Sequence, residues 1–116
     1  MSVPVSCDGM VDPTNATDKS NVQSAVVEGR TLELRQGHIN GVQYAWTRLS
    51  DARDGDSIWL EISGDGGKTW IKCDRRTIRA GRRNYTDAQR TVNDAQVCMR
   101  AVAQLGDSRY QTAAWC

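Results

Sequence analysis

Apolar and polar residues alternate along several short stretches of the chain from residue 30 onward. The clearest examples are residues 31–35, 42–49 and 58–62. A period of two residues is typical of a β-strand with one face in the core. We expect Tyr44, Trp46 and the isoleucines and leucine of residues 58–62 to face inward, with Trp59 on the opposite face.

Turn-forming residues separate these stretches at regular intervals. Asn40-Gly41 is a strong tight-turn dipeptide, and glycine-containing polar segments follow at residues 50–56, 63–68 and 106–108. Further strands are expected over residues 69–73, 96–103 and 110–116, whereas residues 86–97 fit either a helix or a strand. The pattern predicts an all-β protein, a small antiparallel sandwich or barrel of about five to seven strands.

Residues 1–28 differ from the rest of the chain. They contain both prolines and several acidic residues, and neither a strand nor a helix period persists. We interpret them as an extended N-terminal arm, either poorly ordered or able to pair with a partner as an added strand. Residues 29–116 then form a single all-β domain, in keeping with a length of 116 residues.

The charge balance limits the classes of partner that the protein is expected to bind. Fifteen basic residues against 14 acidic ones give a formal net charge of +1, which does not indicate binding to nucleic acid. No apolar run approaches the roughly 20 residues that span a bilayer, so no membrane insertion is expected. The first residues lack the basic start and apolar stretch of a signal peptide, and we expect the mature form of a secreted protein.

Four cysteines point to the compartment: Cys7, Cys73, Cys98 and Cys116. They form no Cys-x-x-Cys pair and only one histidine accompanies them, so a zinc site is disfavoured. We expect two disulfides and an extracellular location, the alternative being four buried thiols in a cytosolic protein. Three pairings of the four cysteines remain open.

One local motif is specific enough to name. Residues 63–70 resemble the Asp-box hairpin of secreted β proteins, matching it at Ser63, Asp65, Gly67, Thr69 and Trp70. In such a turn the aspartate accepts backbone hydrogen bonds, the glycine permits a positive φ and the tryptophan covers the adjacent core. We expect a structural role, and the single copy argues against a propeller built from repeats of this motif.

A basic run follows the motif: Lys72, Arg75, Arg76, Arg79, Arg82 and Arg83, with Asp74 as the only acidic residue among them. Guanidinium groups suit carboxylate or phosphate recognition. An anionic protein surface, an anionic polysaccharide and nucleic acid are the candidate ligands, and nucleic acid ranks last. The alternative is a solvated loop whose charges offset Asp51, Asp54, Asp56 and the acidic arm.

Other candidate chemistry is sparse. Trp59 is the one aromatic expected on an outer face, where it could stack on a sugar. Asp51, Asp54 and Asp56 lack the spacing of a calcium loop. His38 lies in an expected turn, and no nucleophile motif accompanies it. We therefore predict no metal, no cofactor and no enzymatic activity.

Three stretches carry a resemblance to a known group: residues 41–48, 55–60 and 65–73. They resemble small secreted, cysteine-containing β proteins of Streptomyces-like actinobacteria, and the size and layout are similar to the small linker subunits of umbrella toxin particles. The resemblance covers about residues 30–73. It implies a noncatalytic adaptor that joins a toxin-bearing repeat polypeptide to a lectin-carrying subunit in an antibacterial secreted assembly.

Together these observations predict a secreted, disulfide-stabilised adaptor that binds proteins through residues 1–28 and through the basic edge from Lys72 to Arg83. Two alternatives remain. One is an inhibitor of a secreted protease or other hydrolase, with a loop such as Arg75–Arg83 entering an active site. The other is a carbohydrate-binding module that uses Trp59.

Overall fold

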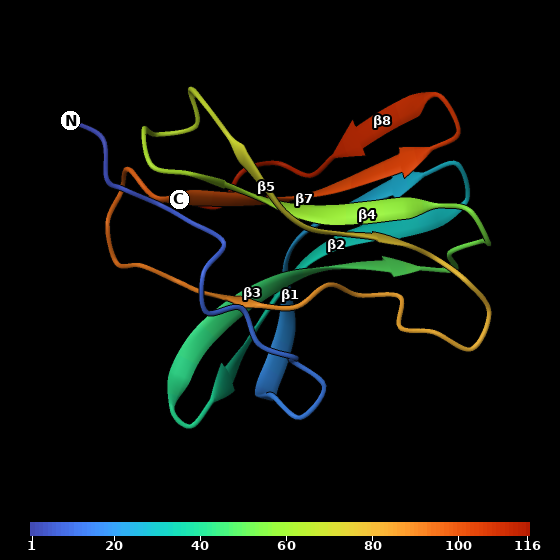
Figure 1. The fold of residues 1–116 in the computed structure, drawn as a ribbon, viewed down its shortest axis with the longest axis horizontal. Helices are drawn as coiled ribbons and strands as arrows, with labels where there is room; N and C mark the ends of the chain where they lie inside the picture. The colour runs from blue at the N-terminus through green and yellow to red at the C-terminus, as the bar shows by residue number, and fades with distance from the viewer.

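Two four-stranded antiparallel sheets pack face to face in the computed structural model, which describes all 116 residues (Figure 1). The first sheet has the order β1-β2-β3-β6, formed by Thr17–Val27, Arg30–Ile39, Val42–Ser50 and Gln89–Arg90. The second has the order β5-β4-β7-β8, formed by Ile71–Thr77, Ser57–Ser63, Cys98–Leu105 and Ser108–Gln111. The prediction of an all-β protein with two disulfides is confirmed, and the strands number eight because β1 and the two-residue β6 add to the six expected.

Two tight turns set the register of the first sheet. Asn40 and Gly41 join β2 to β3 with φ values of 52° and 76°, and Glu28 and Gly29 join β1 to β2 with 48° and 77°. Positive φ at both central residues matches the right-handed twist of the strands that a hairpin connects. The expected boundary at residue 28 therefore falls inside a hairpin, between two paired strands.

The N-terminal residues do not form a separate arm. Residues 17–27 are β1, which pairs with β2 along its length. The preceding residues lie along their own domain: Val3 donates a 2.6 Å backbone hydrogen bond to Gly64, Cys7 is bonded to Cys73, and Val11 pairs with Ala88. Two bulges in β1 interrupt the alternation of side chains, which is why the sequence pattern shows no strand there.

The two disulfides anchor both chain ends to the second sheet. Cys7–Cys73 ties the N-terminal segment to β5, and Cys98–Cys116 ties the last residue to β7. The C-terminal strand is shorter than expected: β8 ends at Gln111, and Trp115 alone pairs with Met99 further along. Residues 86–97, which fitted a helix or a strand, form an irregular segment that contains only β6.

The main core lies between the sheets and is built of aliphatic residues. Leu32, Leu34, Leu49, Ile58 and Leu60 are fully buried there. The expectation that Tyr44 and Trp46 face this core is wrong. Ala45 and Leu49 of β3 point inward instead, and Trp46 packs with Ala16 and Ala88 in a second cluster, covered by irregular segments whose position local alternation cannot predict.

Two ion pairs stabilise the first sheet and the loop beside it, and the pair of Arg30 with Asp56 is buried. Asp56 accepts hydrogen bonds from the Arg30 side chain and the Arg53 backbone, so it serves as a structural anion. On the outer face of the first sheet Glu33 accepts hydrogen bonds from Asn21, Arg48 and Ser50.

Gly64 lies against the N-terminal segment, and an added methyl group would reach to 1.9 Å from the Val3 carbonyl oxygen. We predict that Gly64→Ala displaces residues 1–5 and lowers the free energy of unfolding by about 1–3 kcal/mol, the usual cost of overpacking. Urea denaturation measures the effect. The control is the same substitution in a chain lacking residues 1–4, where the cost should nearly vanish. An equal cost in both backgrounds would contradict the proposed contact.

A second prediction concerns acid stability. Burial raises the pKa of Glu33, but hydrogen bonds from Arg48, Asn21 and Ser50 outweigh it and lower the pKa to about 2. An ordinary glutamate titrates near about 4.3, so this stabilisation is complete above that pH and disappears as the pH falls towards 2. We expect the stability advantage over Glu33→Gln to shrink by about 1–2 kcal/mol between pH 6 and pH 2, since solvent screens the pair with Arg48. A pH series of urea denaturations tests this, and a pH-independent difference would refute it.

Candidate functional site

The outer face of the second sheet gathers basic side chains from three strands around one carboxylate. Register places Lys72 of β5, Glu61 of β4 and Arg100 of β7 side by side. Arg75 of β5 and Arg109 of β8 approach the same centre. We call the four cations, Lys72, Arg75, Arg100 and Arg109, the basic face.

Glu61 is the acceptor at the centre of this face. Its side chain is buried, and it receives hydrogen bonds from the Trp59 indole at 2.8 Å, from Arg100 at 2.9 Å and from Arg109 at 2.9 Å to both oxygens. Burial raises the pKa of Glu61, and these donors more than offset it, so the net pKa is lowered. The carboxylate therefore stays charged and fixes two arginines in position.

Two indole rings support the cations. The Lys72 ammonium lies 4.1 Å from the centroid of Trp59, and the Arg75 and Arg109 guanidinium groups lie 6.0 and 5.9 Å from it. Arg100 stacks on Trp70 at 4.0 Å. These are distances at which a cation is attracted to the face of an aromatic ring.

Trp59 is therefore not the exposed sugar platform that the sequence suggested. It does lie on the outer face of the sheet, as expected, but only 3% of its surface is exposed because the basic side chains cover it. Its indole N–H is also already engaged with Glu61. The ring acts as a support for cations.

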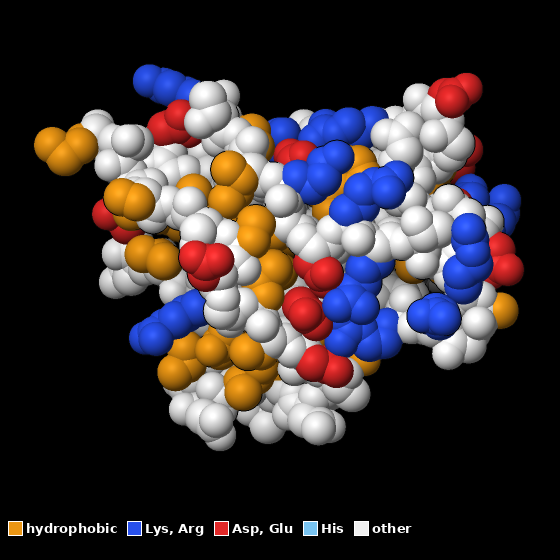
Figure 2. All heavy atoms as spheres, viewed as in Figure 1, with side chains coloured by type: hydrophobic (Ala, Val, Ile, Leu, Met, Phe, Trp, Pro, Cys, Tyr) orange, Lys and Arg blue, Asp and Glu red, His pale blue; other side chains and the backbone are white.

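Positive charge on this face is only partly compensated. Lys72 and Arg75 are exposed and form no ion pair with a carboxylate, and Arg75 donates only to the Ser57 hydroxyl. Four cations thus face a single acid, Glu61, in a protein whose formal net charge is +1. Figure 2 shows basic side chains gathered above β4 and β5.

The rest of the predicted basic run lies elsewhere and is largely neutralised. Arg76 pairs with Asp74 and Asp87, and Arg83 pairs with Asp12 and Asp87. Asp12, from the segment expected to form the acidic arm, thus neutralises part of the positive charge of the run, as the solvated-loop alternative proposed. The other acidic partners are Asp74 and Asp87.

Two arginines of the run remain exposed on the loop after β5. Arg79 donates only to the neighbouring Ile78 carbonyl, and Arg82 forms no ion pair. Between this loop and β5 lies an open depression of about 470 Å³, lined by Arg76, Thr77, Gly81, Arg82 and Arg83. The basic run therefore has three parts. Lys72 and Arg75 lie on the basic face, Arg76 and Arg83 are neutralised by acidic residues, and Arg79 and Arg82 are exposed on the loop.

Sequence reasoning missed Arg100 and Arg109. Each stands alone in its own strand, and only the pairing of β7 with β4 and of β8 with β7 brings them to Glu61. The one available signal was alternation in residues 98–105, which places Arg100 on the face opposite Met99 and Ala101. Nothing local indicates which distant strand becomes its neighbour.

The Asp-box-like turn has the hydrogen bonds expected of it. Asp65 accepts from the backbone N–H groups of Lys68 and Thr69 and from two hydroxyls, and the Trp70 indole donates to Gly67 at 3.1 Å. The side-chain hydrogen bond from Thr69, followed by its backbone N–H, holds the pKa of Asp65 far below its usual range. All four hydrogen bonds to Asp65 come from within the turn, and the turn positions Trp70 beneath Arg100.

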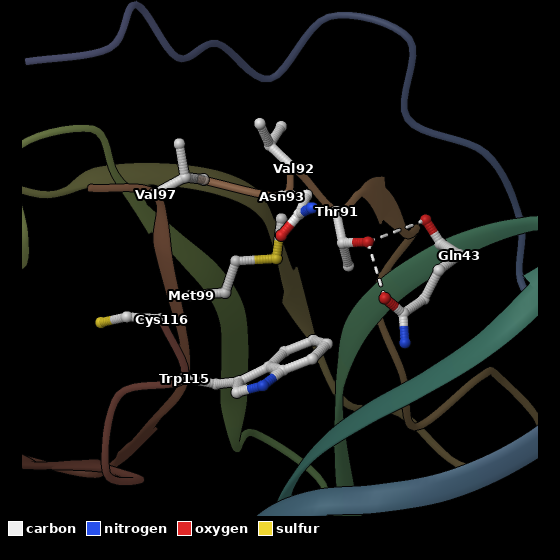
Figure 3. A pocket seen from close by; sticks show the side chains of 8 residues that line it. All are labelled: Gln43, Thr91, Val92, Asn93, Val97, Met99, Trp115 and Cys116. Carbon is white, nitrogen blue, oxygen red and sulfur yellow. Dashed lines mark hydrogen bonds between the residues drawn. The ribbon is translucent and has the colours of Figure 1, made fainter. Parts of the chain in front are cut away.

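A separate pocket of about 330 Å³ opens at one end of the sandwich. Figure 3 shows Met99 and the Trp115 indole on one side and the hydrogen-bonded pair of Thr91 and Gln43 on the other. Val92, half exposed, stands at the rim. The lining contains no charged residue, so this pocket is chemically distinct from the basic face.

Comparison with known proteins identifies no relative: no family model, no curated protein and no solved structure matches the chain. The structure also contains no helix with the length and apolar character needed to cross a membrane. The structure has no cluster of three or more histidine, cysteine, aspartate or glutamate side chains that could bind a metal ion. Asp51, Asp54 and Asp56 therefore form no such cluster.

Neutralising Glu61 should disturb the basic face and the fold together. Glu61→Gln leaves Arg100, whose side chain is 16% exposed, and Arg109 without their shared anion. We predict a loss of about 1–3 kcal/mol in the free energy of unfolding, because partly buried cations become unpaired. Urea denaturation measures it, with Asp107→Asn in the exposed β7–β8 turn as the charge-matched control. Equal stability of the two variants would contradict the central role of Glu61.

Proposed function

We propose that this protein is a noncatalytic, extracellular protein-binding module whose basic face docks on an acidic surface of a partner protein. The observation that carries the proposal is the gathering of four cations around Trp59 and Trp70 on one sheet face, where Glu61 pairs with only two of them, Arg100 and Arg109. Uncompensated charge fixed on a rigid sheet steers association and favours a partner of opposite sign.

The chemistry of the face favours carboxylates as ligands. Arginine forms two parallel hydrogen bonds to a carboxylate, and the Trp59 and Trp70 stacks limit the side-chain motion that binding would otherwise have to restrict. The face is the exposed side of a sheet rather than a cleft, a shape that suits another protein surface. Two disulfides are consistent with an extracellular location.

The adaptor role follows from the resemblance given above. A linker subunit of an antibacterial toxin assembly must hold two proteins, and we assign the basic face to one of them. The N-terminal arm, expected to reach the other, is bonded to its own domain through Cys7 and Val3. The acidic partner surface is therefore the part of the adaptor proposal that the geometry supports best.

One alternative retains a specific observation. The loop after β5 exposes Arg79 and Arg82, and an inhibitor would present such residues to the active site of a hydrolase. The two proposals place the decisive arginines on different surfaces, so one set of variants separates them. Burial of Trp59 leaves the carbohydrate-binding alternative without its proposed platform.

The test captures partners from culture fluid of the producing organism with the tagged protein, followed by affinity measurements on each protein recovered. We predict that the double variant Lys72→Glu/Arg75→Glu binds the partner about ten- to a hundredfold more weakly and that wild-type affinity falls as salt rises. The matched control is Arg79→Glu/Arg82→Glu, which makes the same change in charge at two sites that are also exposed.

The outcomes separate the proposals. Loss of binding in the first variant alone supports the basic face. Loss in the second variant alone, with a hydrolase as the captured protein, supports the inhibitor. Binding that is insensitive to both variants and to salt would overturn the electrostatic mechanism.

A further inference from the structure

A small hollow lies on the outer face of the first sheet. Arg35 of β2 pairs with Trp46 of β3, and Arg48 follows two residues after Trp46, so all three side chains share that face. They line a hollow of about 120 Å³, whose other walls are Pro13, Thr14, Lys19 and Tyr85. The basic face belongs to the other sheet, so this hollow is a separate site.

The charge around the hollow is positive. Its lining contains three cations, Lys19, Arg35 and Arg48, and no acidic residue. Glu33 is the only carboxylate that pairs with any of them, and it binds Arg48 at 2.6 Å. Lys19 and Arg35 form no ion pair, so two positive charges are left without a counterion.

Asp12, beyond Thr14, does not neutralise these charges. It accepts hydrogen bonds from the Thr14 backbone and hydroxyl and pairs with Arg83, which stacks on Tyr85 at 4.7 Å. The charges of Asp12 and Arg83 offset each other, and the excess of positive charge at the hollow therefore remains.

Both arginines of the hollow keep N–H groups free for a ligand. Arg48 donates from Nε and Nη2 to Glu33, which leaves its Nη1 without a partner. Arg35 donates only from Nη1, to the Asn21 side chain at 2.7 Å. Burial and then the charge of Arg48 lower the pKa of Arg35, and Glu33 offsets only part of this effect. A bound anion would reduce the unfavourable proximity of these like charges.

We propose that this hollow binds a carboxylate on a short apolar stem, namely the side chain of a glutamate or aspartate of a partner protein. Guanidinium groups match a carboxylate with two parallel hydrogen bonds. Pro13, Trp46 and Tyr85 provide apolar walls for the methylene groups of such a side chain, a contact that an inorganic anion cannot use. The volume is below the roughly 300 Å³ at which sites for whole small molecules begin, so it suits a single side chain.

The hollow gives the adaptor a second contact. The basic face is the outer face of one sheet and the hollow lies on the outer face of the other, so two acidic proteins can be held on opposite sides of the sandwich. This role rests on the proposed function. Binding of a carboxylate in the hollow does not depend on it and is tested with the protein alone.

NMR titration of the ¹⁵N-labelled protein with N-acetylglutamate amide, a model of one acidic side chain, tests the proposal. All titrations are made at the same ionic strength of about 0.15 M, so that general screening is constant. We expect saturable shifts of the Arg35 and Arg48 Nε–H signals and of the amides around the hollow, with a millimolar dissociation constant. N-acetylglutamine amide, which has the same shape without the charge, should give no saturable shift, and sodium sulfate should bind more weakly.

Two variants assign the binding to the hollow. Arg35→Gln should weaken it about fivefold or more, because one arginine–carboxylate pair is lost. Arg90→Gln is the control with the same change in charge, since Arg90 lies in the same sheet, is exposed and does not line the hollow. Lys19→Gln, at an exposed position, is a second test that leaves β2 unchanged. Circular dichroism establishes that each variant is folded.

The outcomes are distinct from those for the basic face. Lys72→Glu/Arg75→Glu should bind N-acetylglutamate amide as the wild type does, so failure of the basic face as a docking surface would leave this result intact. Equal shifts with the charged and uncharged amides would overturn the proposal. Tighter binding of sulfate would also overturn it, as would full retention of binding in both Arg35→Gln and Lys19→Gln or an equal loss in Arg90→Gln.

Discussion

Glu61 allows the outer face of the second sheet to be charged and closed at the same time. All seven residues of β4 are buried, so this strand needs cover on both sides. Ile58, Leu60 and Ile62 meet the aliphatic core, whereas the opposite side is covered by arginine and lysine side chains lying on Trp59. Without an anion these cations would repel one another, and the carboxylate of Glu61 holds Arg100 and Arg109 in place. The basic face and the burial of β4 thus depend on the same group.

The two ends of the chain also contribute to the core. A protein of 116 residues without phenylalanine has few large side chains with which to fill its core. Segments at both termini contribute: Val3 and Val5 pack against the main core from one end, and Trp115 from the other. The disulfides fix these segments to β5 and β7, and they stabilise the fold mainly by restricting the unfolded chain.

Sequence patterns captured what is local in this protein. Alternation located most of the strands, Asn40-Gly41 set a hairpin, and residues 63–70 have the turn geometry of their motif. β1 was missed because its bulges break the alternation. The inward face of β3 was predicted wrongly because Trp46 is covered by the irregular segments that contain Ala16 and Ala88. The alternation of apolar and polar residues within a strand carries no information about such packing.

Only half of the basic face could be predicted from the sequence. Lys72 and Arg75 lie in the basic run, and the structure shows them beside Trp59. Arg100 and Arg109 lie in β7 and β8, and only the pairing of β7 with β4 and of β8 with β7 brings them to the site. Arg76 and Arg83 do not belong to the site, because acidic side chains neutralise them: Asp12, Asp74 and Asp87. Side-chain charge is visible in a sequence, whereas its compensation depends on three-dimensional proximity.

The order of strands has a consequence for how the chain reaches its native state. β1, β2 and β3 are joined by two tight turns, so most of the first sheet can form from neighbours in sequence. In contrast, β4 pairs with β7, where Ser57 lies opposite Gln104. Closing such a long loop costs entropy before its contacts form, which slows folding. We therefore expect the hairpins of the first sheet to form before the second sheet, and β4, the central strand beneath the basic face, to pair with β7 late in folding.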